Sequence, residues 1–131
     1  MLTPVPVSRV PHEWDRIAMV LRPAVERDPK RDMEDLLYAA MHGFLRLWRP
    51  KEGDGYIATE AQGKALQVVY VGGVSQGLRS MKRLLAALET AALSQKCREV
   101  KFEGRDWRRV APGYVAAKGD DGRWKFRRRI A

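Results

Sequence analysis

Cysteine and histidine are scarce in this chain of 131 residues, and their scarcity excludes several kinds of site. The single cysteine, Cys97, cannot form an internal disulfide, and we expect it to be a buried, unreactive side chain. The two histidines, His12 and His42, lie far apart in the sequence. Without paired cysteines or clustered histidines, the sequence predicts no metal site.

Long apolar runs are also absent. No stretch of about 18 apolar residues occurs, so no transmembrane helix is expected. The N-terminal residues lack the basic segment and apolar core of a signal peptide. Together with the missing disulfide, these observations predict a protein of the cytosol of the cell that makes it.

Acidic residues are few relative to basic ones. Lysine and arginine number 25, and aspartate and glutamate number 16, which gives a net charge of +9. The last 14 residues, from Lys118 to Ala131, hold six basic and two acidic side chains and so carry +4 of this charge. Such an excess indicates an anionic partner: a nucleic acid, an acidic protein surface or a phosphorylated cofactor.

The first third of the chain shows helical patterning after a proline-rich start. We expect an extended segment or edge strand over residues 1–11, followed by a helix from about His12 that Pro23 ends or kinks. Asp32 is a suitable N-cap for a second helix, which Gly43 would stop.

From residue 44 onward, alternating patterns predict strands. The segment Ala65–Val71 is the most apolar of them and is therefore expected at the centre of a sheet. The expected elements are strands over 44–48, 56–60, Ala65–Val71 and Arg98–Glu103, helices over Ser80–Leu93 and Trp107–Ala111, and a hairpin over Tyr114–Ile130. Helices that lie between runs of strands predict an α+β fold around one mixed sheet, with a single domain over 1–131.

This order of elements resembles the GNAT superfamily of N-acetyltransferases. Three stretches, Tyr70–Gly73, Cys97–Val110 and Gly113–Tyr114, are in addition similar to small GNAT-like proteins of bacteriophages and prophages. The resemblance implies a GNAT-like domain whose mixed central sheet is flanked by helices. It also implies a location in the cytoplasm of a bacterial host cell, or incorporation in a phage particle.

The resemblance places a cofactor site in the loop before the long helix. Members of the superfamily bind the pyrophosphate of acetyl-coenzyme A with Gln/Arg-x-x-Gly-x-Gly/Ala, where backbone N–H groups face the anion. Gln76 matches the first position, Gly77 would supply backbone freedom, and Arg79 would form a salt bridge to a phosphate. However, Arg79 and Met81 stand where the two small residues belong, so the sequence predicts that acetyl-coenzyme A binds weakly or not at all.

The candidates for acid–base chemistry are Glu60 and Tyr70. Acetyl transfer to an amine needs a base for the amine proton and benefits from an acid for the departing thiolate. The apolar strand contains no carboxylate, so Glu60 on the preceding strand is the nearest base candidate. The resemblance puts the usual acid, a tyrosine, at Arg109, which leaves Tyr70 as the acid candidate.

Three functions fit these observations. The replaced glycines and the missing acid and base favour a non-catalytic GNAT-fold protein that binds other proteins in an assembly such as a virion. The alternative is an N-acetyltransferase that depends on acetyl-coenzyme A. The third is a nucleic-acid-binding module, because arginines alternate with aromatic residues from Trp107 to Arg109 and along Arg123–Arg129.

The last strand is the expected partner-binding surface. Its alternation places Trp124, Phe126 and Ile130 on one face. The opposite face carries four basic residues: Arg123, Lys125, Arg127 and Arg129. We expect this strand to lie near a sheet edge and its basic face to engage an acidic protein surface.

Overall fold

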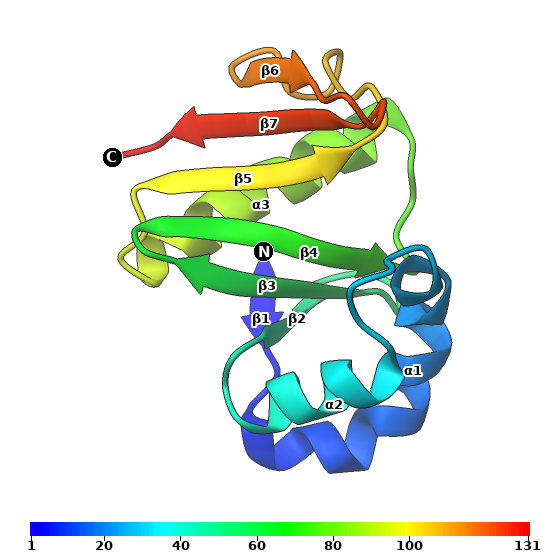
Figure 1. Cartoon of the computed structure of the whole chain (residues 1–131). Helices are drawn as coiled ribbons and strands as arrows, with labels where there is room; N and C mark the ends of the chain where they lie inside the picture. Colours follow the sequence, from blue (N-terminus) through cyan, green and yellow to red (C-terminus); the bar gives the residue numbers. More distant parts are fainter. The chain divides into compact units, whose positions relative to one another are not determined.

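The computed structural model describes residues 1–131, which form seven β-strands and three α-helices (Figure 1). The strands make one mixed sheet in the order β1-β2-β3-β4-β5-β7-β6, so the predicted α+β class is confirmed. The chain forms two compact units. The N-terminal unit comprises Leu2–Glu60 and Tyr70–Val74, and the C-terminal unit comprises Met1, Ala61–Val69 and Ser75–Ala131. The expected single domain over 1–131 stays a prediction.

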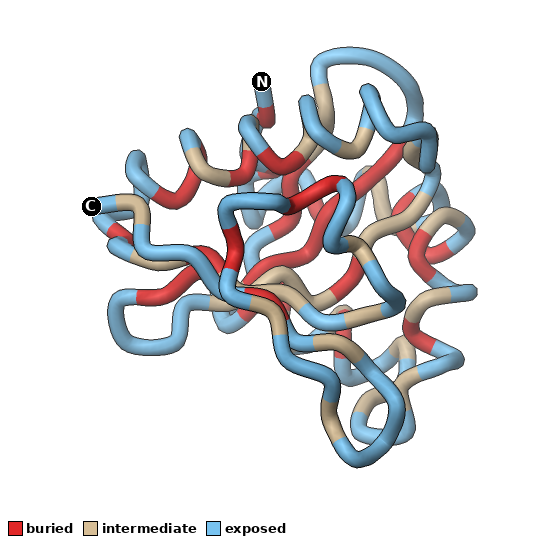
Figure 2. Tube along the Cα trace, turned by 90° about the horizontal axis from the view of Figure 1, so that it is seen from above, coloured by how far each residue is buried: buried red, intermediate tan, exposed pale blue.

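The N-terminal unit combines short strands with two helices. Its elements are β1 (Leu2–Pro4), a 3-10 turn (Val7–Arg9), α1 (Val10–Glu26), α2 (Met33–Met41), β2 (Arg46–Pro50), most of β3 (Tyr56–Gln62) and the end of β4 (Ala65–Gly72). On α1, the residues at helical spacing are buried, among them Ile17, Leu21 and Val25. Buried residues lie mainly in the interior of the trace, and exposed residues on its outer turns (Figure 2). None of the three helices is both long enough and apolar enough to cross a membrane.

Proline positions explain where the first helix departs from the prediction. The helix begins at Val10, two residues before the expected His12, and Pro11 occupies its first turn, where a missing N–H group costs little. Pro23 lies inside α1 and does not end it, because the helix continues to Glu26. The predicted cap of α2 is confirmed: Asp32 and Asp35 accept each other's backbone N–H at 2.9 Å.

The C-terminal unit contains one helix against the sheet. Its elements are the start of β4, α3 (Leu78–Ser94), β5 (Glu99–Gly104), β6 (Val115–Lys118) and β7 (Trp124–Arg129). β4 pairs with β5 in parallel, with Leu66 opposite Val100, as expected for the central strand. Leu85 and Ala92 of α3 pack on Val100 and Phe126, so one face of β5 and β7 forms the core of this unit.

The short helix predicted in this unit is wrong. Residues 107–111 form a single turn instead of a short helix, with the N–H groups of Val110 and Ala111 both donating to the carbonyl of Trp107. The turn cannot grow because Pro112 follows it. The last strand lies near the sheet edge, as predicted: β7 is between β5 and β6, and β6 is the edge strand.

Candidate functional site

The first turn of α3 is an uncapped helix N-terminus. Gly77 is its N-cap and has no side chain that could accept a hydrogen bond from the helix. The first intrahelical bond joins the N–H of Met81 to the carbonyl of Gly77 at 2.9 Å. The N–H groups of the residues in between therefore point outward without an intrahelical acceptor, at the positive end of the helix dipole.

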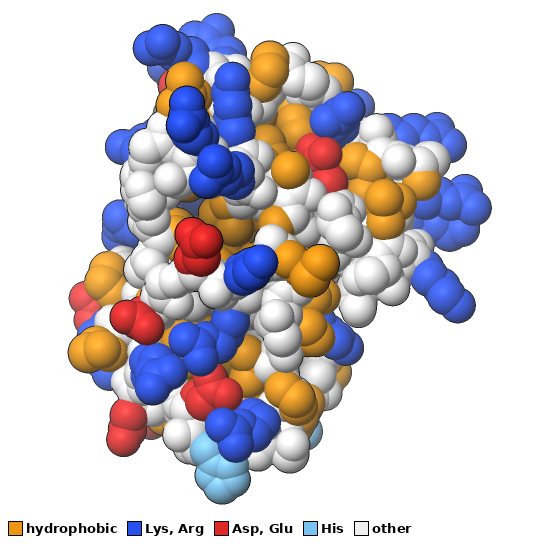
Figure 3. Space-filling model, turned by 180° about the vertical axis from the view of Figure 1, so that it is seen from behind, with side chains coloured by type: hydrophobic (Ala, Val, Ile, Leu, Met, Phe, Trp, Pro, Cys, Tyr) orange, Lys and Arg blue, Asp and Glu red, His pale blue; other side chains and the backbone are white.

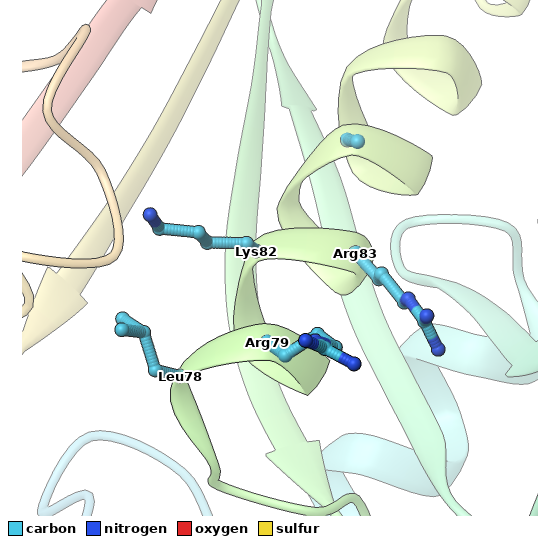
Figure 4. Close-up of a pocket in the computed structure, with 5 residues that line it drawn as sticks. Leu78, Arg79, Lys82 and Arg83 are labelled. Atoms are coloured by element: carbon cyan, nitrogen blue, oxygen red, sulfur yellow. The ribbon is translucent and has the colours of Figure 1, made fainter.

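Basic side chains surround this helix start. Arg79, Lys82 and Arg83, with Leu78 and Ala86, line a shallow depression of about 420 Å³ along the outside of the first turns. In Figure 4, Arg79 and Arg83 extend to one side of the helix and Lys82 to the other. Figure 3 shows lysine and arginine side chains gathered at the top of the rear face, on the side where α3 begins.

This arrangement is unfavourable for the helix taken alone. The first turn contains no acidic residue, although acids are the residues that the positive end of a helix dipole favours. Arg79 and Arg83 are four residues apart, a spacing at which like charges repel on a helix. An anion bound at the helix start would relieve both penalties, so the site suits a ligand such as a phosphate.

The bulk expected of Met81 does not reach the helix start. Its side chain is half-buried and packs against the hydrophobic core of the C-terminal unit. The sequence places two long side chains, Arg79 and Met81, at the small positions of the motif. Of these two, only Arg79 stays at the helix start, where it is exposed and charged. A Cβ atom on Gly77 would meet nothing closer than Ser75 Oγ at 3.7 Å, so the space beside the N-cap is open.

Gln76 is held by an arginine that sequence reasoning missed. Its Oε1 accepts a hydrogen bond of 2.7 Å from Arg105 Nη2. The Arg105 guanidinium in turn lies over the ring of Trp107, at 4.2 Å from its centroid. The contact adds another cation beside the loop that precedes α3. No sequence signal joins two residues 29 positions apart.

Gly72 has a packing role in the N-terminal unit. A Cβ atom at this position would overlap the carbonyl oxygen of Val20, so only glycine lets the end of β4 approach α1 so closely. This glycine therefore belongs to the fold and not to a ligand site.

In the N-terminal unit, Glu60 and Tyr70 belong to a cluster with Asp28 and Arg31. The hydroxyl of Tyr70 donates to Asp28 Oδ2 at 2.5 Å, and Arg31 Nη2 donates to Glu60 Oε2 at 3.0 Å. Burial and the bond to Asp28 raise the pKa of Tyr70 well above its usual value, so its hydroxyl stays protonated at neutral pH. Both acid–base candidates are thus already engaged by other side chains.

The tyrosine of the Gly113–Tyr114 pair is engaged as well. Tyr114 is buried, and its hydroxyl donates to Glu89 Oε2 at 2.7 Å. Arg128 Nη1 lies 3.2 Å from the same carboxylate oxygen. Burial and the bond to Glu89 raise the pKa of Tyr114 far above its usual range, so its hydroxyl stays protonated. The exposed Arg109 occupies the position at which the resemblance expects an acid.

The arginines and tryptophans after β5 contact one another. Arg108 lies over Trp124, at 4.2 Å from the ring centroid, and its guanidinium pairs with Asp106 at 2.8 Å. Hydrogen bonds from Arg108 lower the pKa of Asp106 to about 2. Trp107 and Trp124 are partly buried against the core. These contacts occupy faces on which a nucleic-acid base would have to stack.

Comparison with known proteins gives a likeness of fold. A scan against models of protein families found no match, and a search of curated proteins found none. Among solved structures, aminoglycoside 6′-acetyltransferase type Ii shares 14% identity and a TM-score of 0.71, over 100% of this chain and 97% of that one. An aminoglycoside 6′-N-acetyltransferase complexed with coenzyme A shares 12% identity and a TM-score of 0.68, over the same fractions of the two chains. The chain has the GNAT acetyltransferase fold.

A third structure extends the likeness. An acetyltransferase of the GNAT family from Listeria monocytogenes shares 7% identity and a TM-score of 0.60, over 99% of this chain and 94% of that one. At such identities the likeness concerns the fold alone. The resemblance predicted from the sequence is confirmed at this level, while a phage origin stays a prediction.

Proposed function

We propose that this chain is an N-acetyltransferase that uses acetyl-coenzyme A. The observation that carries the proposal is the start of α3. In a chain with an acetyltransferase fold, an uncapped helix N-terminus follows the central strand, with Arg79, Lys82 and Arg83 beside it and no acidic residue in its first turn. The proposal departs from the expectation of weak or no cofactor binding, and it is supported by Met81 packing inward and by Gly77 leaving the helix end open.

The residues at this helix start fit a diphosphate. Outward-facing N–H groups of the first turn would bind its oxygens, and Arg79 and Lys82 would neutralise its charge. Gln76 and Arg105 would fix the loop that precedes the helix. Acetyl-coenzyme A would supply the acetyl group as a thioester.

In the N-terminal unit, Tyr70 is the candidate proton donor and Glu60 the candidate base. Tyr70 is protonated, but its proton is directed at Asp28, and Glu60 is paired with Arg31. We therefore expect transfer to rely on positioning of an amine that is already unprotonated, with little help from a base. The rate should then rise with pH as the acceptor amine loses its proton.

The experiment is an assay of coenzyme A release in the presence of a panel of amines, with acetylated product identified by mass spectrometry. The variant Arg79→Glu/Lys82→Glu should raise the KM for acetyl-coenzyme A at least tenfold. The control Lys51→Glu/Lys64→Glu changes the net charge equally at two exposed loop positions and should change KM less than twofold. Absence of amine-dependent thiol release with every amine would contradict the proposal.

A non-catalytic protein-binding role, as in a phage assembly, is the second candidate. It is favoured by one observation: Glu60, Tyr70 and Tyr114 all have their polar groups engaged by other side chains. This candidate predicts no amine-dependent thiol release, whether or not acetyl-coenzyme A binds, so the same assay separates the two.

A further inference from the structure

One face of the sheet in the C-terminal unit is open. α3 is the helix of this unit, and it packs on the face that holds Val100 and Phe126. In Figure 1, α3 lies behind β5, and no helix of the unit lies in front of β5, β7 and β6. The open face consists of the alternate residues Glu99, Lys101 and Glu103 of β5, Lys125, Arg127 and Arg129 of β7, and Val115 and Ala117 of β6.

The strand register arranges the charges of this open face in rows. Glu99 lies opposite Arg129 at one end, and Glu103 lies opposite Lys125 at the other. Each end row contains one acid and one base. Lys125 Nζ is 3.8 Å from Glu103 Oε1, whereas Glu99 Oε1 is buried and has no hydrogen-bond partner. The basic strand expected from the sequence is thus neutralised in part by the neighbouring strand, which sequence alternation could not show.

The middle row is different. Lys101 lies directly opposite Arg127, and Val115 of β6 lies on the other side of Arg127. Two like charges in direct cross-strand register are destabilising. Neither Lys101 nor Arg127 has a side-chain hydrogen bond or ion pair, and Val115 is 63% exposed. The centre of the open face is therefore a pair of free cations beside an exposed apolar side chain.

We infer that this open face docks an acidic protein surface, with carboxylates of the partner over Lys101 and Arg127 and an apolar side chain of the partner on Val115. A partner carboxylate would neutralise the repelling pair, and burial of Val115 would add an apolar contact. The proposal is independent of the acetyltransferase proposal, since it uses none of the residues at the start of α3.

The same rows disfavour a nucleic acid as the partner. A phosphate backbone carries a charge at every nucleotide and would have to pass over Glu99 or Glu103 at the ends of the face. The face also holds no aromatic side chain on which a base could stack, because Phe102, Trp124 and Phe126 contact the core on the opposite face. A discrete cluster of carboxylates matches a charged centre with neutral ends better than a polyanion does.

The test is an NMR titration of the full chain with a 14-residue peptide that carries four central glutamates around one leucine. We expect amide shifts centred on Lys101, Val115 and Arg127, which weaken as salt rises. The variant Lys101→Glu/Arg127→Glu should lower the affinity at least tenfold. The control Lys51→Glu/Lys64→Glu, with the same net charge, should change it less than twofold.

Four outcomes would overturn the inference. They are no peptide binding at physiological salt, amide shifts confined to the start of α3, equal losses of affinity in both double variants, and stronger binding of a 12-nucleotide DNA than of the peptide at the same residues.

A second readout distinguishes a loss of binding from a variant that fails to fold. The single change Lys101→Glu should weaken peptide binding and at the same time raise the melting temperature, because it replaces a repelling pair by an attracting one. A misfolded variant would lower the melting temperature.

Discussion

Single side chains in this protein are held by partners far away in the sequence. Tyr70 reaches Asp28 across 42 positions, and Tyr114 reaches Glu89 across 25. Partial burial acts to raise the pKa of Asp28, but the hydrogen bond from Tyr70, the N–H of Lys30 and the charge of Arg31 outweigh it and lower the pKa below its ordinary value. The ionised carboxylate therefore stabilises the folded state.

Tyr70→Phe should lower the free energy of unfolding by about 1–3 kcal/mol at pH 7, since it removes a hydrogen bond to a charged group. Asp28 has a depressed pKa when folded, so its contribution is present above the unfolded value of about 3.9 and is lost as pH falls through the folded value. The difference between the wild type and the variant should therefore shrink at pH 3. Urea unfolding of both proteins at pH 7 and pH 3 measures this difference in the free energy of unfolding.

Tyr38→Phe is the control for this change, because Tyr38 is 60% exposed. It should leave stability within about 0.5 kcal/mol of the wild type at both pH values. An equal loss for Tyr70→Phe at pH 7 and pH 3 would show that the hydroxyl acts through packing and not through the Asp28 carboxylate.

At the scale of whole elements, features set by residues close in sequence were predicted better than features set by which strands pair. The cap at Asp32 and the central position of Ala65–Val71 follow from side chains close in sequence, and both are confirmed. The place of β7 between β5 and β6 depends on which strands pair, and alternation reveals faces but not neighbours. For the same reason, no sequence pattern indicates that Lys101 lies opposite Arg127.

The contact of β4 with α1 in the N-terminal unit provides a test at this scale. Gly72→Ala should lower the free energy of unfolding by about 1–3 kcal/mol or more, because its Cβ would overlap a backbone carbonyl that only moves with the helix. Gly77→Ser, at the open N-cap, should keep or slightly raise stability. Urea unfolding midpoints compare the two, and equal stability of the Gly72 variant and the wild type would contradict the packing role.

Over the whole molecule, charge is the property that connects sequence to function. The net charge of +9 predicted an anionic partner, but it could not say where the anion binds. The motif located Gln76, Gly77 and Arg79, whereas Lys82 and Arg83 were missed even though their spacing from Arg79 places them near the same helix end. Arg105 could be found only from the structure, because its contact with Gln76 joins distant segments.

The most direct test of the central claim, that the start of α3 holds the phosphates of acetyl-coenzyme A, is a calorimetric titration of three proteins with that molecule. The wild type should bind. Gly77→Asp should bind at least tenfold more weakly, because a carboxylate at the N-cap takes the free N–H groups and repels phosphate, while stability stays equal or rises. Lys64→Gln, which changes the net charge equally at an exposed turn, should bind within twofold of the wild type. No binding by the wild type, or equal binding by Gly77→Asp, would contradict the account.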